Sequence, residues 1–131
     1  MASLDSHIDI FLQPGEFYFG DSETRIRTIL GSCVAITLWH PRKMIGGMCH
    51  YMLPKGKRRD RHLDGRFAED AMQLFLRELA LSHTAPHEYE VKIFGGGNQF
   101  PEKQSAIFSV PDKNIDAGLA LLEYHGFSIK S

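Results

Sequence analysis

The sequence predicts a layered α+β domain in which two main helices pack on one side of a mixed or antiparallel sheet. Two strand-like apolar runs separated by only about five residues favour an antiparallel hairpin, because a parallel crossover needs a dozen residues or more. Two other segments carry apolar residues at helical spacing. With 131 residues, 43% of them apolar, the chain can bury one core, so we expect a single domain over residues 1–131.

The two strands of the predicted hairpin are the clearest. Val34 to Trp39 is a mostly apolar run that ends at His40-Pro41, and Ile45 to Leu53 is a second run that ends at Pro54. Shorter strands are expected at residues 17–19, after a turn at Pro14-Gly15, and at residues 25–30, 88–94 and 127–129.

The first predicted helix covers about residues 66–81. Its apolar residues recur every three or four positions, at Phe67, Ala71, Leu74, Phe75 and Leu79. Asp64 is expected to cap this helix, since a carboxylate there can accept hydrogen bonds from free backbone N–H groups. The second helix is expected from residue 111 or 113 to residue 124, with a stop at Gly126.

The charge balance argues against nucleic acid or anionic lipid as a partner. Fifteen basic and sixteen acidic side chains give a formal charge of −1. The N-terminus lacks the pattern of a signal peptide, and no apolar run approaches the ~20 residues that span a bilayer, so we expect a cytoplasmic protein without membrane insertion. Two cysteines are too few for a disulfide scaffold, which makes the reactivity of each worth considering.

Cys33 is the first candidate for chemistry. It follows Gly31-Ser32, where a turn becomes the strand that starts at Val34. Small residues there let a substrate carbonyl approach, and backbone N–H groups around the thiol could hold the oxyanion that forms on attack. A lone cysteine is also commonly an inert apolar residue, so this segment by itself leaves both interpretations open.

His50 is the second candidate, because it lies in the apolar segment from Ile45 to Leu53. A buried histidine needs a partner, and a structural histidine bonded to a backbone carbonyl is a common case. Cys33 begins one predicted strand and His50 lies along the next, so the two side chains can approach across the hairpin. A thiol and an imidazole that meet can exchange a proton, which gives a thiolate nucleophile and an imidazolium acid.

The run TILGSCVAITLWHPRKMIGGMCHYMLP closely resembles the signature of the CheD chemoreceptor glutamine deamidases, in which Leu-Gly-Ser-Cys-Val is followed by Gly-Gly-Met-x-His and Met-Leu-Pro. Three other segments resemble the same family: QPGEFYF its opening strand, GRFAEDAMQLFLREL its main helix, and KIFGGGNQF its glycine-rich strand end. The resemblance covers nearly the whole chain, and the motifs together are more specific than any one of them.

The resemblance implies a protein-glutamine deamidase that converts glutamine side chains of methyl-accepting chemoreceptors to glutamate without a metal or organic cofactor. It implies Cys33 as nucleophile and His50 as acid–base partner, with an upstream threonine to complete the site. Thr28 is the nearest threonine, and we name it as the group that orients His50. The family often carries its threonine one place earlier, where this chain has Arg27. Because neighbouring strand residues face opposite sides, Thr28 as a simple strand residue stays an alternative.

The resemblance further implies a helical receptor surface as substrate, and hence an open, shallow site. It implies a CheC-type phosphatase as a second partner. Two rivals remain: a catalytically silent module that docks on receptors or on the phosphatase, which Arg27 favours, and a cysteine peptidase. The family's pattern commonly continues beyond the equivalent of Ser131, so this chain is either naturally short or shortened there.

Other residues near the two candidates have competing interpretations. Cys49 points away from His50 on a regular strand, so packing is its expected role, ahead of a disulfide with Cys33 or a metal site formed with Cys33 and His50. Gly95-Gly96-Gly97-Asn98 is either a site wall or a plain turn, and the basic run from Lys55 to Arg61 is a solvated loop or a docking surface for acidic helices.

Overall fold

The computed structural model describes residues 7–56, 62–95 and 113–129. The elements follow in the order β1 (Ile8–Leu12), β2 (Phe17–Asp21), β3 (Thr24–Thr28), β4 (Val34–His40), β5 (Ile45–Tyr51), α1 (Ala68–Leu81), a short 3-10 turn (Pro86–Glu88), β6 (Glu90–Gly95) and α2 (Lys113–Tyr124). Both predicted helices and both hairpin strands are confirmed, and β1 is an additional strand ahead of the first one that we expected.

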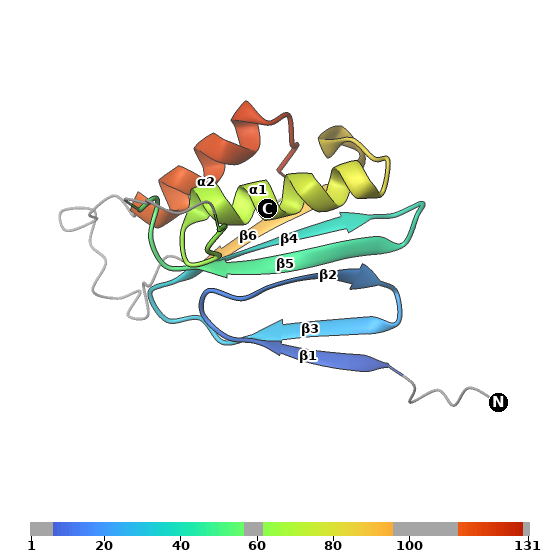
Figure 1. Ribbon diagram of the computed structural model, residues 1–131, viewed down its shortest axis with the longest axis horizontal. Coiled ribbons are helices and arrows are strands. Elements are labelled where there is room, and N and C mark those ends of the chain that lie inside the picture. Colours follow the sequence, from blue (N-terminus) through green and yellow to red (C-terminus); the bar gives the residue numbers. More distant parts are fainter. Residues whose placement is uncertain (1–6, 57–61, 96–112, 130–131) are drawn as a thin grey trace, which may run out of the picture.

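The strands β4 and β5 form the centre of a four-stranded antiparallel sheet with the order β2-β5-β4-β6. The predicted hairpin is therefore confirmed, and it closes through a turn in which Met44 has a φ of 58°. Both helices cover one face of this sheet (Figure 1). The predicted α+β class, with the helices on one side, is confirmed.

The helix-covered face of the sheet holds the core. Alternate residues of a strand point to opposite faces, so one set of side chains from the central strands meets the helices. This set is Val34, Ile36 and Leu38 of β4 with Cys49 and Tyr51 of β5, and it packs against Ala71, Met72, Phe75 and Leu79 of α1. Phe75 is fully buried and makes an edge-on contact with Phe17, with the ring centroids 4.9 Å apart.

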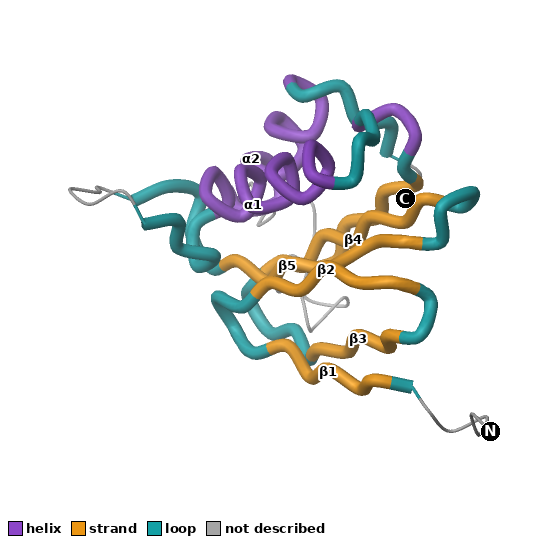
Figure 2. The backbone as a smooth tube through the Cα atoms, turned by 45° about the vertical axis from the view of Figure 1, so that its right-hand side comes forward, coloured by secondary structure: helices purple, strands orange, loops and turns teal. Residues whose placement is uncertain are grey.

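A second, two-stranded parallel sheet of β1 and β3 lies on the side of the large sheet away from the helices (Figure 2). Along β3, Thr24, Ile26 and Thr28 are half-buried, whereas Arg25 and Arg27 are exposed. The half-buried residues line cavities together with residues of β4 and β5, so this side of β3 faces the large sheet. Thr28 therefore points toward the strands that carry His50.

The start of α1 corrects the role predicted for Asp64, because no side chain caps this helix. The Asp64 carboxylate instead accepts hydrogen bonds from the Arg66 guanidinium, with Nη2 to Oδ2 at 2.6 Å. The N–H of Ala68 donates to the carbonyl oxygen of Leu53 at 2.8 Å. The backbone that follows β5 thus satisfies the first turn of α1 and ties the helix to the hairpin.

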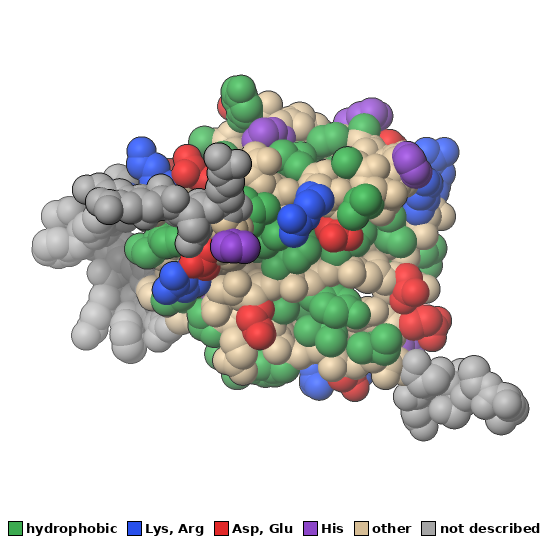
Figure 3. Space-filling model, in the orientation of Figure 1, with side chains coloured by type: hydrophobic (Ala, Val, Ile, Leu, Met, Phe, Trp, Pro, Cys, Tyr) green, Lys and Arg blue, Asp and Glu red, His purple; other side chains and the backbone are tan. Residues whose placement is uncertain are grey.

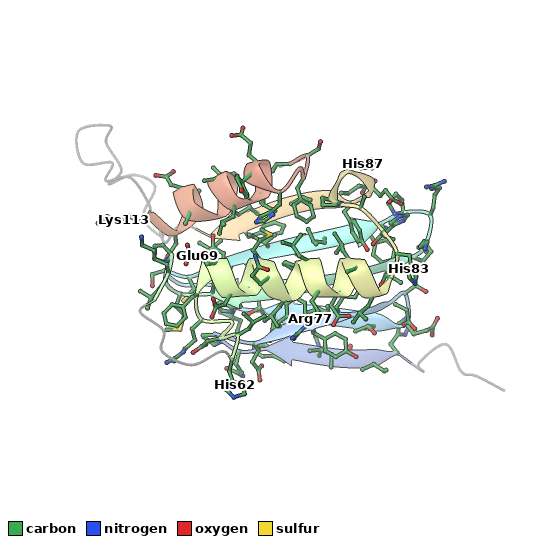
Figure 4. The ribbon with its side chains drawn as sticks, turned by 45° about the horizontal axis from the view of Figure 1, so that its top comes forward. His62, Glu69, Arg77, His83, His87 and Lys113 are labelled. Atoms are coloured by element: carbon green, nitrogen blue, oxygen red, sulfur yellow. The ribbon has the colours of Figure 1, made fainter. Side chains whose placement is uncertain are left out.

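Charged side chains cover the outer side of the helix layer, where Glu69, Arg77 and Lys113 point into solvent (Figure 4). Positive and negative side chains of the described residues are interspersed on the face seen in Figure 3. The strand predicted at residues 127–129, all of them described, does not form. Ile129 makes only a single parallel bridge to Val91. Neither α1 nor α2 has the length and apolar character that a bilayer crossing demands.

Candidate active site

His50 lies on the face of β5 that is turned away from the helices. It is paired with Ala35 across the hairpin, and its side chain is only 1% exposed. Its backbone is held on the other edge of β5, since its carbonyl oxygen accepts the N–H of Gly15 at 2.7 Å and its N–H donates to the Glu16 carbonyl oxygen at 3.3 Å. The Pro-Gly turn after β1 therefore fixes the position of His50.

Thr28 and His50 are in direct contact, with Thr28 Oγ1 2.8 Å from His50 Nδ1. The same hydroxyl donates a hydrogen bond to the carbonyl oxygen of Leu12 at 2.7 Å. A threonine hydroxyl has one proton, so it must accept its bond from His50, which requires the proton on Nδ1. In this arrangement the neutral imidazole has its lone pair on Nε2.

The Nε2 atom of His50 is buried and has no hydrogen-bond partner among the residues that the structure describes. Buried polar atoms normally have a partner, so an orphaned imidazole nitrogen needs an explanation. Burial lowers the pKa of His50 from its ordinary value of 6.5, and the nearby carbonyl of Leu12 opposes this effect in part. The neutral form is therefore favoured, and its free lone pair can accept a proton.

The other described histidines lack this combination. His40 is as buried as His50, but its Nε2 lies 2.8 Å from Glu88 Oε1 and its Nδ1 accepts the N–H of Lys43 at 3.0 Å. His62, His83 and His87 are exposed and lie at separate places around the helix layer (Figure 4). His40 is thus a structural histidine with a hydrogen-bond partner at each ring nitrogen. The Nε2 of His50, in contrast, is buried and has no partner among the described residues.

Cys33 directly precedes β4 and stands two residues before Ala35, the cross-strand partner of His50. Its thiol is free and half-buried. Gly95 of β6 lies against the backbone of Cys33, and a Cβ at that glycine would collide with the Cys33 carbonyl oxygen. Residues two apart on a strand share a face, so the alternation of β4, extended by one residue, predicts that Cys33 lies on the face of Ala35 and His50.

Cys49 belongs to the core and not to this group. It is 1% exposed, packs on the helix side of β5, and burial raises the pKa of its thiol to about 12. The packing role predicted for Cys49 is confirmed. Both cysteines are free, and Cys49 lies on the opposite face of β5 from its neighbour His50, so Cys33, Cys49 and His50 do not converge on one metal position.

A cavity of about 370 Å³ adjoins Thr28, between β3 and the open face of the large sheet. Arg27, Thr28 and Ala35 line it together with the apolar residues Ile26, Leu30, Met48 and Phe94. Neither this cavity nor the contribution of Leu12 followed from the sequence, although the alternation in Ile8-Asp9-Ile10-Phe11-Leu12 is a signal for a strand. Residues 96–98 of the predicted glycine-rich wall and residues 57–61 of the basic run lie outside the described residues.

Comparison with known proteins gives a consistent family. A family model described as CheD chemotactic sensory transduction matches residues 52–131. A protein of Pseudomonas syringae pv. tomato named probable chemoreceptor glutamine deamidase CheD is 48% identical over 126 residues, which cover 95% of this chain and 75% of that protein. Proteins with this name from Dechloromonas aromatica (numbered CheD 3) and Leptospira interrogans (CheD 1) are 52% and 43% identical, over 87% and 92% of this chain and 68% and 74% of theirs.

The family model begins two residues after His50, so it does not itself include the candidate site. The alignment to the Pseudomonas syringae protein leaves out only about 5% of the chain, which is too little to exclude the segment from Thr28 to His50. A match to more than half of the chain and identities near 50% over most of it lead to one conclusion: the chain belongs to the CheD family.

Proposed function

We propose that this protein is a chemoreceptor glutamine deamidase in which Cys33 is the nucleophile, His50 its proton acceptor and donor, and Thr28 the group that orients His50. The observation that carries the proposal is the unpartnered Nε2 of His50, whose Nδ1 contacts Thr28, on the face of the hairpin where the alternation of β4 predicts Cys33. The relatives' names give the substrate class, the glutamine side chains of chemoreceptors.

In the first half of the reaction, Nε2 of His50 removes the proton from the Cys33 thiol as the sulfur attacks the carboxamide carbon of the glutamine. Burial lowers the pKa of His50, so its resting imidazole is neutral and can take up the thiol proton during attack. The carbonyl oxygen becomes an oxyanion, for which the bend that ends at Cys33 offers backbone N–H groups. His50 then gives its proton to the departing nitrogen, which leaves as ammonia.

In the second half, the neutral His50 takes a proton from water as the oxygen attacks the thioester carbon. The carbon–sulfur bond breaks, the proton returns to the sulfur, and glutamate is released. Thr28 accepts a hydrogen bond from the Nδ1–H of His50 in both halves of the reaction, because its own hydroxyl proton is donated to the Leu12 carbonyl oxygen. The imidazole therefore keeps one orientation and one tautomer in both halves.

The contact between Thr28 and His50 weakens the alternative that the protein is a catalytically silent binding module. That interpretation rested on Arg27 at the position of the family's threonine, but Thr28 is the residue whose hydroxyl touches His50. Arg27 is exposed on the other side of β3. The second alternative is a cysteine peptidase, in which Cys33 and His50 hydrolyse a backbone amide. A peptidase would cleave the receptor, whereas a deamidase leaves it intact and slightly heavier.

The test is incubation of the protein with a chemoreceptor cytoplasmic fragment, followed by mass spectrometry of its peptides. Deamidation adds about one dalton at each modified glutamine, since OH replaces NH2. The Cys33→Ala variant is expected to lose the activity by about 10⁴-fold or more, whereas Cys49→Ala keeps it. An unmodified fragment after incubation with the wild-type protein would exclude the proposal, and shortened fragments would indicate a peptidase.

The proposal places the reaction in the cytoplasm, a reducing compartment in which the unpaired thiols of Cys33 and Cys49 persist. Chemoreceptors are the partner that the relatives' names support. The CheC-type phosphatase implied by the resemblance stays a prediction. Co-purification of the two proteins at micromolar concentration tests it.

A further inference from the structure

The cavity beside Thr28 is larger and more apolar than the chemistry of one glutamine needs. Its volume of about 370 Å³ corresponds to roughly a dozen non-hydrogen atoms, at the ~30 Å³ that each water molecule occupies. A glutamine side chain fills less than half of this space, and its carboxamide must lie at Cys33 and not in an apolar chamber. Most of its lining is apolar, from Ile26, Leu30, Met48 and Phe94, and Arg27 is the one charged residue among the described residues that line it.

We propose that this cavity is a specificity subsite for a second substrate side chain, an apolar one that lies one helical turn from the target glutamine. The inference rests on the proposed deamidase function and adds to it a requirement on the substrate sequence. Ile26, Met48 and Phe94 are among the residues that line this subsite.

The spacing of the sheet supports this assignment. Met48 precedes His50 by two residues on β5, which places its side chain on the same face and roughly 6.7 Å farther along the strand. Successive turns of a substrate helix are about 5.4 Å apart. When the target glutamine reaches the row of Ala35 and His50, the residue one turn away therefore faces the row of Thr37 and Met48.

The exposure of Phe94 supports the same assignment. Phe94 is paired with Ala35, which is paired with His50, so the three residues form one row across β6, β4 and β5. Phe94 is 46% exposed, so its ring leaves apolar surface that a partner side chain can cover. A substrate helix that enters the site passes this ring, and an apolar side chain that covers it gains affinity.

A second cavity, of about 220 Å³, shares Ile26 and Met48 with the first and lies farther from His50. Asp21, Thr24 and Thr37 take part in its lining, so its charged residue is acidic, whereas that of the first cavity is Arg27. The proposal concerns the first cavity alone, because Thr28 and Ala35, which contact or pair with His50, line it.

The experiment uses peptides with one glutamine in a helical host sequence rich in Glu and Lys. One leucine is placed three or four residues before or after the glutamine, and the all-serine peptide has serine at each of these positions. The wild-type protein should deamidate at least one leucine peptide about 10-fold or more faster in kcat/KM than the all-serine peptide, chiefly through a lower KM. Phe94→Ala should reduce this preference to less than about 3-fold, whereas Phe11→Ala removes a similarly exposed aromatic ring from β1 and should preserve it.

A second variant and a second readout make the result independent of folding and of turnover. Met48→Phe fills the subsite, and it should lower kcat/KM on the leucine peptide more than on the all-serine peptide, so that the ratio of the two falls to less than about 3-fold. Binding of both peptides to Cys33→Ala protein should show the leucine preference without any reaction. Equal kcat/KM and equal binding for all peptides would overturn the subsite. Preferential binding without deamidation by the wild-type protein would instead support the subsite and refute the deamidase.

Discussion

Thr28 and His50 are joined by a contact of 2.8 Å between hydroxyl oxygen and Nδ1, although they lie on different sheets. The Leu12 carbonyl takes the only hydroxyl proton, at 2.7 Å, and thereby sets the direction of the Thr28–His50 bond. Three segments that are separate in sequence thus determine which nitrogen of His50 is free. The orientation of the base depends on how the small sheet packs on the large one.

Replacement of Thr28 by valine removes the acceptor and leaves the Nδ1 proton without a partner. We expect Thr28→Val to lower kcat by about 10²-fold or more, because the imidazole can then turn or change tautomer. Thr28→Ser keeps a hydroxyl at the same place and should stay within about 10-fold of the wild-type protein. Rates follow from the mass gain of a receptor fragment. Equal rates for the valine and serine variants would show that the contact has no role in the reaction.

The burial of His50 predicts the acid side of the pH profile. Its pKa lies below 6.5 in the folded protein, and the base is active in its neutral form. We expect kcat/KM to hold between pH 7 and pH 6.5 and to fall only at lower pH. A profile whose acid limb has a midpoint above 6.5 would contradict a buried, neutral His50.

The same shift affects stability in a defined direction. The unfolded chain binds a proton at His50 near pH 6.5, while the folded chain resists it until a lower pH. The free energy of unfolding should therefore decrease as the pH falls from about 6.5 toward the folded pKa. The His50→Gln variant should show a weaker decrease over this range in urea unfolding, and an identical slope would count against the shift.

Local patterns were sufficient for the elements that make local contacts. The apolar runs of β4 and β5 and the short connection between them predicted the hairpin, and helical spacing predicted α1 and α2. The failure at Asp64 has a local and a tertiary cause: Arg66, two residues away, occupies its carboxylate, and the backbone after β5 accepts the hydrogen bond from the start of the helix. Capping by a distant segment leaves no mark within the helix sequence.

The site was predictable in its residue types but not in its geometry. The resemblance pointed to Cys33, His50 and Thr28, yet the offset from Arg27 left the direction of Thr28 open. That direction depends on β3 pairing in parallel with β1, a strand that we did not predict. Parallel partners are joined by a non-local register, which alternation within one segment does not specify.

The two cysteines should differ in reactivity with iodoacetamide. Cys33 is half-buried, whereas Cys49 is sealed in the core with its pKa raised to about 12, so it stays protonated and inaccessible at pH 8. We expect one adduct on the native protein and two after denaturation, counted by intact-mass spectrometry. Cys33→Ala should give none in the native state, while Cys49→Ala should still give one. Rapid labelling of native Cys33→Ala would contradict this arrangement.

Gly95 offers a test of the position of Cys33 itself. Its φ of 128° is accessible to glycine, and a Cβ there would strike the Cys33 carbonyl oxygen. Gly95→Ala should therefore shift the backbone beside the thiol and lower kcat by about 10²-fold, because small misplacements of a reacting group are costly. The deamidation rates of the wild-type protein and of Gly95→Ala on the same receptor fragment measure this effect.

Gly126 is the matched control for Gly95. It also has a positive φ, 87°, but nothing lies within 4 Å of the Cβ that alanine would add. Gly126→Ala should carry the backbone strain alone, a loss of about 1–2 kcal/mol in the free energy of unfolding, with kcat unchanged. If both alanine variants lose activity in proportion to their lost stability, the close approach of Gly95 does not position the nucleophile. A loss of kcat in Gly95→Ala alone, measured well below both melting temperatures, identifies β6 as the support that holds Cys33 in place.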